Sequence, residues 1–253
     1  MAAAMTVSVP SDEGVPALPK GQLLYAVGDI HGRLDLLRDL LQLIADDAHT
    51  RSQATRRALV FLGDYVDRGP DSSGVIARLI AGAVPGFDTY FLKGNHEAIL
   101  LNFLGDPLHL DHWLMNGGQA TLESYGVDTR GLAEAGASKE AWRETFAAAL
   151  PETHLRFFRT LRLSVTIGDY LFVHAGVRPG VPLAAQSEDD LVWIRRPFLD
   201  HAGPFGKFVV HGHTPGLLPV IRPNRIGIDT GAVFSDRLTA LRLEDRARAF
   251  LHT

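Results

Sequence analysis

Carboxylate and imidazole side chains occur in short glycine-containing segments, each placed just after an apolar stretch. Asp29 and His31 stand two residues apart. In an extended segment both side chains point to the same side, so they can bind one cation. Asp64 follows the next apolar stretch, and its carboxylate is the candidate to bridge two cations. Arg68 lies four residues later and carries a planar guanidinium suited to phosphate oxygens. Together these side chains predict metal and phosphate chemistry.

Three further clusters have the same character. Asn95 can offer a carbonyl oxygen to a metal, and His96 beside it can act as an acid or an electrostatic partner. His174 follows another apolar run directly. His211 and His213 form a His-x-His pair after the next run, and spacing alone leaves open which of them faces a metal.

Each cluster also has an ordinary structural interpretation. Read alone, Asn95 is favoured as a helix N-cap, Arg68 as a surface charge and His174 as a core histidine. The joint occurrence of the clusters outweighs these interpretations, because five of the eleven histidines fall in them. Carboxylates and histidines buried together at one sheet edge need a cation to compensate them. We therefore predict a metal centre.

The elements that position these clusters follow a repeated pattern. Short apolar runs that stop at a glycine predict strands at residues 23–27, 58–62 and 89–92. Helical periodicity follows each run, over residues 34–44, 75–80 and 98–104. Strand–loop–helix three times over indicates parallel α/β units, whose ligands bind at the carboxyl edge of the sheet.

The second half of the chain differs in character. Helix formers predominate in residues 105–160, which predicts a helical insert or cap. Strands are then expected at residues 163–167, 170–173, 208–210, 226–228 and 238–243, the first two as a hairpin. We expect a flexible leader over residues 1–20 and a single domain over residues 21–253. Its fold class is α/β, an α/β/β/α sandwich with a central two-sheet core.

Composition excludes several classes of protein. With 25 basic and 29 acidic residues the net charge is −4, and no basic stripe indicates a nucleic-acid partner. The absence of cysteine excludes disulfides, thiolate-bound zinc and a cysteine nucleophile. No run approaches the ~18 apolar residues of a membrane span, and residues 1–20 do not read as a secretory signal. We expect a cytoplasmic protein without a membrane partner; the oligomeric state stays open.

The ordered motifs resemble those of the calcineurin-like metallophosphoesterases, and within them the phosphoprotein-phosphatase branch. These motifs are Gly-Asp-Ile-His-Gly at residues 28–32, Gly-Asp-Tyr-Val-Asp-Arg-Gly at 63–69 and Gly-Asn-His-Glu at 94–97. Downstream segments are similar to those of small bacterial and phage serine/threonine protein phosphatases: Trp-x-x-Asn-Gly-Gly at 113–118, Trp-Ile-Arg at 193–195, Gly-His-Thr-Pro at 212–215 and Ile-Asp-Thr-Gly-Ala-Val-Phe at 228–234. The resemblance extends from residue 23 to residue 243.

The resemblance implies two divalent metal ions per chain that share a water or hydroxide, which attacks phosphorus. The implied first metal site is Asp29, His31 and Asp64. The implied second site, bridged by Asp64, adds Asn95, His174 and His213. The resemblance favours His213 as the ligand, with His211 kept as a supporting residue or substrate contact. It points to Mn²⁺ first, with Fe or Zn²⁺ as alternatives compatible with oxygen and nitrogen ligands.

The resemblance also implies catalytic and substrate-binding roles. Arg68 and Arg195 correspond to phosphate clamps, with Arg196 as the rival of Arg195, and Asn95 contacts the phosphate. His96 corresponds to the general acid for the leaving group, oriented by Asp67.

Three functions compete at this level. The leading hypothesis is a phosphomonoesterase acting on phosphoproteins at Ser/Thr, with Tyr as an alternative. The second is symmetrical hydrolysis of a dinucleoside tetraphosphate such as Ap4A. A catalytically inactive binding scaffold is the third, and the presence of every implied ligand and of His96 argues against it.

Overall fold

A mixed six-stranded sheet carries the first half of the site. The computed structural model describes residues 5–6, 14–51 and 54–253. Three parallel strands alternate with helices in chain order: β2 (Gln22–Val27), α1 (Leu34–His49), β3 (Arg56–Phe61), α2 (Ser72–Ile80), β4 (Asp88–Phe91) and α3 (Asn95–Gly105). The three predicted α/β units are therefore present. Antiparallel strands extend the sheet beyond β2, in the order β10 (Thr239–Glu244), β11 (Ala247–His252) and β1 (Met5–Thr6).

A five-stranded sheet packs against the first. Its spatial order is β5 (Ser164–Ile167), β6 (Tyr170–Val173), β7 (Phe208–His211), β9 (Arg225–Gly227) and β8 (Val220–Arg222). The expected hairpin is present, since β5 and β6 pair in antiparallel register. The pairs β6–β7 and β7–β9 are parallel, so the carboxyl ends of these three strands share one edge.

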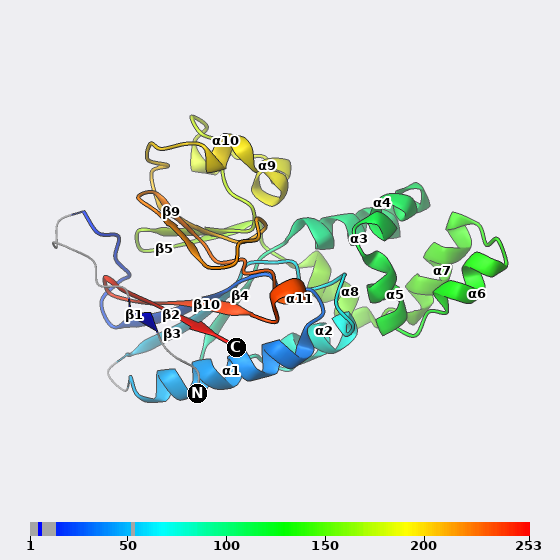
Figure 1. The fold of residues 1–253 in the computed structure, drawn as a ribbon, viewed down its shortest axis with the longest axis horizontal. Helices are drawn as coiled ribbons and strands as arrows, with labels where there is room; N and C mark the ends of the chain where they lie inside the picture. Colours follow the sequence, from blue (N-terminus) through cyan, green and yellow to red (C-terminus); the bar gives the residue numbers. More distant parts are fainter. Residues whose placement is uncertain (1–4, 7–13, 52–53) are drawn as a thin grey trace.

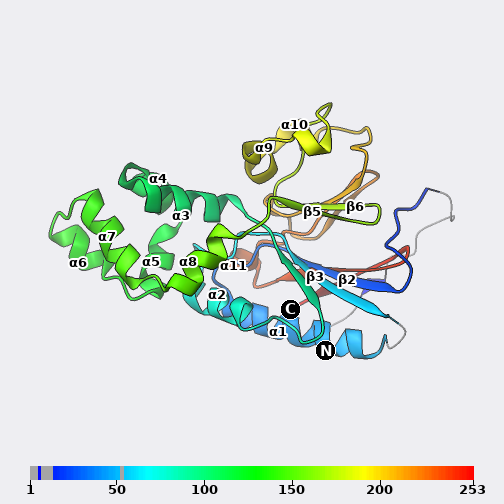
Figure 2. The same ribbon diagram turned by 180° about the vertical axis from the view of Figure 1, so that it is seen from behind.

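Alternating apolar side chains divide the core into layers. Leu24 and Val60 face Phe172 and Val210 between the two sheets. On the outer face of the six-stranded sheet, residues such as Tyr25 pack under α1 and α2. On the outer face of the other sheet the cover is α9 (Glu188–Trp193) and α10 (Arg196–Leu199). The predicted α/β/β/α sandwich is confirmed (Figures 1 and 2).

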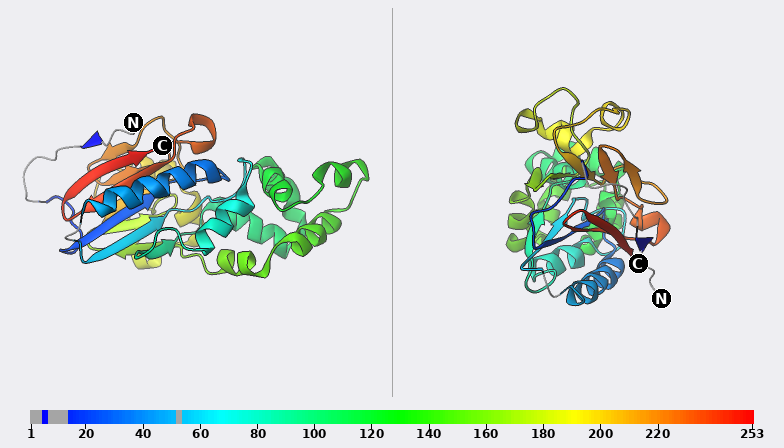
Figure 3. Two further views of the ribbon diagram at one scale, coloured as in Figure 1. Left: turned by 90° about the horizontal axis from the view of Figure 1, so that it is seen from below. Right: turned by 90° about the vertical axis from the view of Figure 1, so that its left-hand side faces the viewer.

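The segment between α3 and β5 is mainly helical. Its helices are η1 (Pro107–His109), α4 (Leu110–Met115), α5 (Gly118–Ser124), α6 (Thr129–Glu134), α7 (Lys139–Ala149) and α8 (Glu152–Arg159). This insert projects from the end of the sandwich at which the parallel strands finish (Figure 3). The remaining short helices, η2 (Leu183–Ala185) and α11 (Ala232–Ser235), lie in loops of the sandwich.

The leader expected over residues 1–20 lies largely outside the described residues. In its described part Leu18 is buried and its backbone N–H donates to Asp245 O at 2.9 Å, so this part packs on the sandwich. Among the described residues, no helix combines the length and apolar character needed to cross a bilayer.

Candidate metal centre

Asp64 lies where two groups of potential metal ligands meet. One group contains Asp64, His31 and His96, and the other contains Asp64, His174 and His213. Within each group the ligand atoms lie within 4.8 Å of one another, and all the side chains are buried. The Asp64 Oδ2 atom is 3.6 Å from His31 Nε2 and 3.4 Å from His174 Nε2. This position is compatible with a bridging carboxylate.

Two of these histidines turn Nε2 toward the carboxylate of Asp64. His31 Nδ1 lies 2.8 Å from Val66 O, and His174 Nδ1 lies 2.9 Å from Leu62 O. Carbonyl oxygens only accept, so each Nδ1 carries a proton and donates it. In a neutral ring Nε2 then presents a lone pair toward Asp64 oxygens. Such an arrangement needs a cation, and backbone carbonyls commonly fix metal-binding histidines in this way.

The charges around His174 also indicate that a cation is needed beside Asp64. Burial lowers the pKa of His174, but Asp64, Asp29 and Glu97 together raise it to about 10. The pKa of Asp64 is well below its ordinary value despite its burial, because His174 and His96 stabilise its negative charge. A proton on His174 thus stands where a metal ion would neutralise the carboxylates. The residues present fit a divalent cation.

Asn95 faces the second ligand group and is not the N-cap of α3. The N-cap of α3 is Gly94, and Asn95 is the first helical residue. Its Oδ1 lies 3.0 Å from His174 Nε2 and 2.8 Å from His213 Nδ1. The N-cap interpretation was therefore wrong for this asparagine, and the amide oxygen faces the second ligand group.

Asp29 lies beside the second group. One of its oxygens, Oδ2, accepts from the backbone N–H of His213 at 3.0 Å. The other, Oδ1, is buried and has no hydrogen-bond partner among the described residues. A Cβ at Gly212 would lie 2.1 Å from this oxygen, so only glycine fits there. Burial and the neighbouring Asp229 raise the pKa of Asp29, because the positive charge of the protein does not fully compensate this carboxylate, and the residue therefore fits a cation ligand.

His96 and Asp67 form a buried pair. His96 Nδ1 lies 2.7 Å from Asp67 Oδ2, and Nε2 is buried without a partner among the described residues. Burial favours the neutral ring, yet the carboxylates of Asp64 and Asp67 raise the pKa of His96 above its ordinary value. The ring is therefore suited to holding a proton on Nε2 beside Asp64.

Two exposed arginines contact the ligand groups. Arg68 Nη1 lies 3.0 Å from His31 Nε2, and Arg195 Nε donates to His213 Nε2 at 3.2 Å. Arg196 begins α10, and its side chain makes no such contact among the described residues. The structure thus brings Arg68 and Arg195 to opposite sides of the centre.

Strained backbone concentrates at the same place. Seven non-glycine residues in the described part of the chain have positive φ, and five are predicted site residues: His31, Asp64, Asp67, Arg68 and His213. Each left-handed residue costs roughly 1–2 kcal/mol. Such strain clusters where function fixes side-chain directions, which agrees with a functional site at these strand ends.

His211 is not part of the ligand groups. Strand alternation places it with Val209 on the outer face of β7. There its ring meets Phe198 edge-on at 4.9 Å, and Nδ1 lies 3.0 Å from Gly212 O. This position gives no support to the expected substrate contact.

Several residues around the centre had no role in the sequence analysis. Glu97 accepts backbone N–H groups from Asp64, Tyr65 and Gly94 at 2.7–2.9 Å and so holds the Asp64 loop. Burial and nearby Asp64 raise its pKa to about 7. The signals for these residues were the motifs themselves: Glu97 ends Gly-Asn-His-Glu and Asp229 lies in the 228–234 segment.

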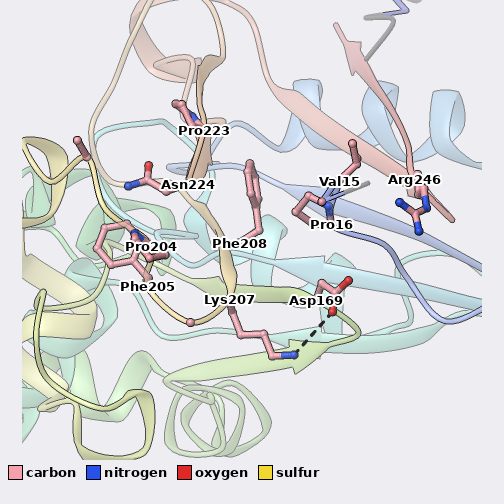
Figure 4. A pocket seen from close by; sticks show the side chains of 13 residues that line it. Val15, Pro16, Asp169, Pro204, Phe205, Lys207, Phe208, Pro223, Asn224 and Arg246 are labelled. Atoms are coloured by element: carbon pink, nitrogen blue, oxygen red, sulfur yellow. Dashed lines mark ion pairs between the residues drawn. The ribbon is translucent and has the colours of Figure 1, made fainter. Parts of the chain in front are cut away.

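A cavity of about 650 Å³ lies at the other end of the sandwich (Figure 4). Its lining includes Asp169, Lys207 and Phe208 at the amino ends of β6 and β7, and it contains none of the predicted site residues. The metal centre occupies the opposite edge of the sheets.

Comparison with known proteins agrees with this geometry. A model of the family described as calcineurin-like phosphoesterase matches residues 23–238. The chain is 28% identical to the asymmetrical bis(5'-nucleosyl)-tetraphosphatase PrpE of Oceanobacillus iheyensis, covering 87% of this chain and 88% of that protein. It is 30% identical to serine/threonine-protein phosphatase 1 of Salmonella typhimurium, covering 87% and 92%.

Solved structures share the fold. A putative diadenosine tetraphosphatase has a TM-score of 0.58 at 23% identity, covering 95% of this chain and 94% of that one. A cold-active protein tyrosine phosphatase has a TM-score of 0.57 at 17% identity, covering 94% and 83%. The relatives are phosphatases, and this chain is a metal-dependent phosphatase like them. Because the family model spans most of the sequence, the chain belongs to the calcineurin-like phosphoesterase family.

Proposed function

We propose that this protein is a dinuclear-metal phosphomonoesterase that removes phosphate from phosphoproteins, at Ser/Thr residues first and with Tyr as an alternative. The observation that supports it most is the meeting of two ligand groups at Asp64, with Asp67 within hydrogen-bond distance of His96 from the first group. Two exposed arginines flank this arrangement and carry the positive charge that a terminal dianionic phosphate requires.

Two divalent cations would be held by this ligand set. The first would use His31 and Asp64 together with Asp29, which lies beside the second ligand group. The second would use Asp64 with Asn95, His174 and His213. Carboxylate, imidazole and amide donors suit Mn²⁺ first, with Fe and Zn²⁺ as alternatives. When bound, such ions activate water and neutralise charge on the phosphate.

The chain's own residues would bind and protonate the ester. Arg68 and Arg195 hold the phosphate oxygens from two sides, and the Asn95 amide orients the group between them. His96 delivers a proton from Nε2 to the departing oxygen. Asp67 keeps the ring in place through Nδ1, which leaves Nε2 directed at Asp64 and the substrate. General-acid steps of this kind contribute about 10²–10⁴-fold in rate.

The surroundings of the arginines favour a large substrate. Met115 and Phe234 are 79% and 75% exposed. Met115 precedes the turn that contacts Arg68. Phe234 lies near Pro215, two residues after His213, since the Cβ position of Gly231 is 3.8 Å from an atom of each of these side chains. Exposed apolar side chains beside a catalytic site are suited to contact with a protein. The Salmonella relative named as a serine/threonine phosphatase supports the same substrate class.

Hydrolysis of dinucleoside tetraphosphates is the second candidate. The relatives named PrpE favour it, and their names specify asymmetrical cleavage, whereas the motifs alone suggested the symmetrical reaction. Asymmetrical cleavage of Ap4A would yield ATP and AMP, and symmetrical cleavage would yield two ADP.

A substrate panel with Mn²⁺ tests the proposal. We expect turnover of p-nitrophenyl phosphate and a higher kcat/KM for a Ser/Thr phosphopeptide than for Ap4A. Chromatography of the nucleotide products identifies the cleavage type. Preferential turnover of Ap4A would replace the phosphoprotein assignment, and no turnover of any ester would contradict the phosphatase assignment itself.

A further inference from the structure

The Trp-x-x-Asn-Gly-Gly segment of the insert reaches the catalytic pair. Trp113 in α4 is fully buried, and its indole Nε1–H donates to both oxygens of Asp67, at 3.0 and 3.1 Å. Asp67 Oδ2 also accepts from His96 Nδ1 at 2.7 Å. A side chain of the insert thus holds the carboxylate on which the ring of His96 depends.

A second residue of the insert grips the same aspartate. Thr121 in α5 donates its hydroxyl to Asp67 Oδ1 at 2.6 Å and accepts the Asp67 backbone N–H at 2.8 Å. Ser72, at the start of α2, lies 3.0 Å from the Thr121 hydroxyl and accepts the same N–H at 3.1 Å. The hydroxyl hydrogen of Thr121 is committed to Asp67, so Ser72 is the donor between the two. Both carboxylate oxygens and the backbone N–H of Asp67 are therefore hydrogen-bonded, with only one assignment of donors and acceptors for the two hydroxyls.

We propose that Trp113 and Thr121 are positioning residues for proton transfer, which makes the helical insert part of the catalytic machinery. The inference rests on the phosphatase function proposed above. Asp67 lies in a left-handed backbone conformation that its neighbours must maintain. Without its two donors from the insert, the carboxylate would rotate or recruit water, and His96 would lose the orientation that directs Nε2 toward the leaving oxygen.

The prediction concerns the leaving group. Protonation matters little when p-nitrophenolate departs, because it is a stable anion, and it matters much when phenolate or an alkoxide departs. A misplaced His96 should therefore slow poor substrates selectively. A merely destabilised protein would slow all substrates to the same degree.

Four variants separate these outcomes. Trp113→Phe removes the N–H donor and keeps an aromatic ring, and Thr121→Val removes the hydroxyl at similar volume. Thr121→Ser keeps the hydroxyl. Trp142→Phe is the matched control, because Trp142 is a buried tryptophan of α7 in the same insert whose indole makes no hydrogen bond among the described residues.

The measurements are kcat on a series of aryl phosphates, metal content per chain and thermal unfolding. We expect Trp113→Phe and Thr121→Val to lower kcat for phenyl phosphate by about tenfold, with p-nitrophenyl phosphate changed by less than about twofold. Thr121→Ser and Trp142→Phe should keep the wild-type dependence on the leaving group, and metal content should be unchanged throughout.

Equal losses on good and poor leaving groups in both Trp113→Phe and Thr121→Val would overturn the positioning role. The wild type and His96→Asn serve as references. If the wild type hydrolyses none of the aryl phosphates, the proposed function fails. If His96→Asn alone changes the leaving-group dependence, the acid stands and the positioning role of the insert fails.

Discussion

His96 has one ring nitrogen committed to Asp67 and the other, Nε2, without a partner among the described residues. A buried imidazole with a free nitrogen is costly unless that nitrogen meets a ligand. The neighbouring Asp64 oxygen, 3.9 Å away, is too distant for a hydrogen bond. We therefore propose that the free Nε2 acts on a bound substrate.

At this scale we predict that His96→Asn impairs catalysis according to the leaving group. The substitution removes the proton donor, so kcat for phenyl phosphate should fall by about 10²–10⁴-fold. The fall for p-nitrophenyl phosphate should be much smaller. Steady-state kinetics on both esters measures the difference, and equal losses would contradict the acid role.

The residues of the centre were largely predictable, and their neighbours were not. Asp29, His31, Asp64 and Asn95 follow strands directly, and strand ends are where a parallel sheet presents ligands. Trp113 and Thr121 lie 46 and 54 positions from Asp67, which they contact. No spacing rule connects residues that far apart in the chain, so only the folded insert reveals the contact.

The insert also contacts Arg68, through the turn between α4 and α5. Arg68 N–H donates to Gly117 O at 3.1 Å, and Gly117 has a φ of +93°. A Cβ at Gly117 would lie 2.8 Å from Arg68 Cγ and 3.0 Å from its backbone N. The turn between α4 and α5 therefore fixes the backbone and the base of the side chain of Arg68, next to Asp67, which Trp113 of α4 and Thr121 of α5 contact.

We predict that Gly117→Ala raises KM for phosphate esters about five- to tenfold, the equivalent of one displaced hydrogen bond of ~1–1.5 kcal/mol. Gly126→Ala is its matched control, since Gly126 has a φ of +82° and open space around its Cβ position. Both variants should lose about 1–2 kcal/mol of unfolding free energy through backbone strain. Steady-state kinetics and urea unfolding compare them, and an equal rise of KM in both would refute contact with Arg68 as the cause.

Helix α8 contains a buried histidine, His154, that we expect to make stability depend on pH. Burial lowers the pKa of His154, and its Nδ1 lies 2.8 Å from the Tyr125 hydroxyl oxygen. The folded state thus keeps the ring neutral below the ordinary pKa of 6.5, while the unfolded chain takes up a proton. Stability should therefore fall as pH drops through 6.5.

Thermal unfolding between pH 7.5 and 5.5 measures this effect. His154→Gln should show a smaller fall in Tm over that range than the wild type. His49→Gln, at an exposed histidine, should follow the wild type. The same slope in all three proteins would exclude His154 as the titrating group.

How well a strand or helix could be predicted from the sequence depended on its length and on whether it forms only by pairing with another strand. The strands of the α/β units were visible because each is an apolar run closed by glycine. The short strand β8 and the terminal strand β11 were not predicted, because each forms by pairing with another strand and not from a strong local pattern. The short helices α9, α10 and α11 were missed because four to six residues show no clear helical period.

At the scale of the whole molecule the insert and the sandwich share one core. The apolar cluster under α1 and α2 continues from Tyr25 and Phe61 to Phe103, Trp113 and Phe146 of the insert side. We therefore still propose a single domain over residues 21–253. The shared core also makes the position of Trp113 depend on the packing of the entire insert. The centre lies where the two parts meet, at the carboxyl ends of the strands (Figure 1).

We propose that Asp64 joins two metal sites that act together. Metal-stripped protein titrated with Mn²⁺, with activity on p-nitrophenyl phosphate and bound metal per chain measured at each step, tests it most directly. We predict that activity rises to its maximum at two equivalents per chain, and that Asp64→Asn, with its fold intact by circular dichroism, binds less metal and is nearly inactive. Full activity of the metal-stripped protein, or maximal activity at one equivalent of Mn²⁺ per chain, would contradict the proposal of two joined sites.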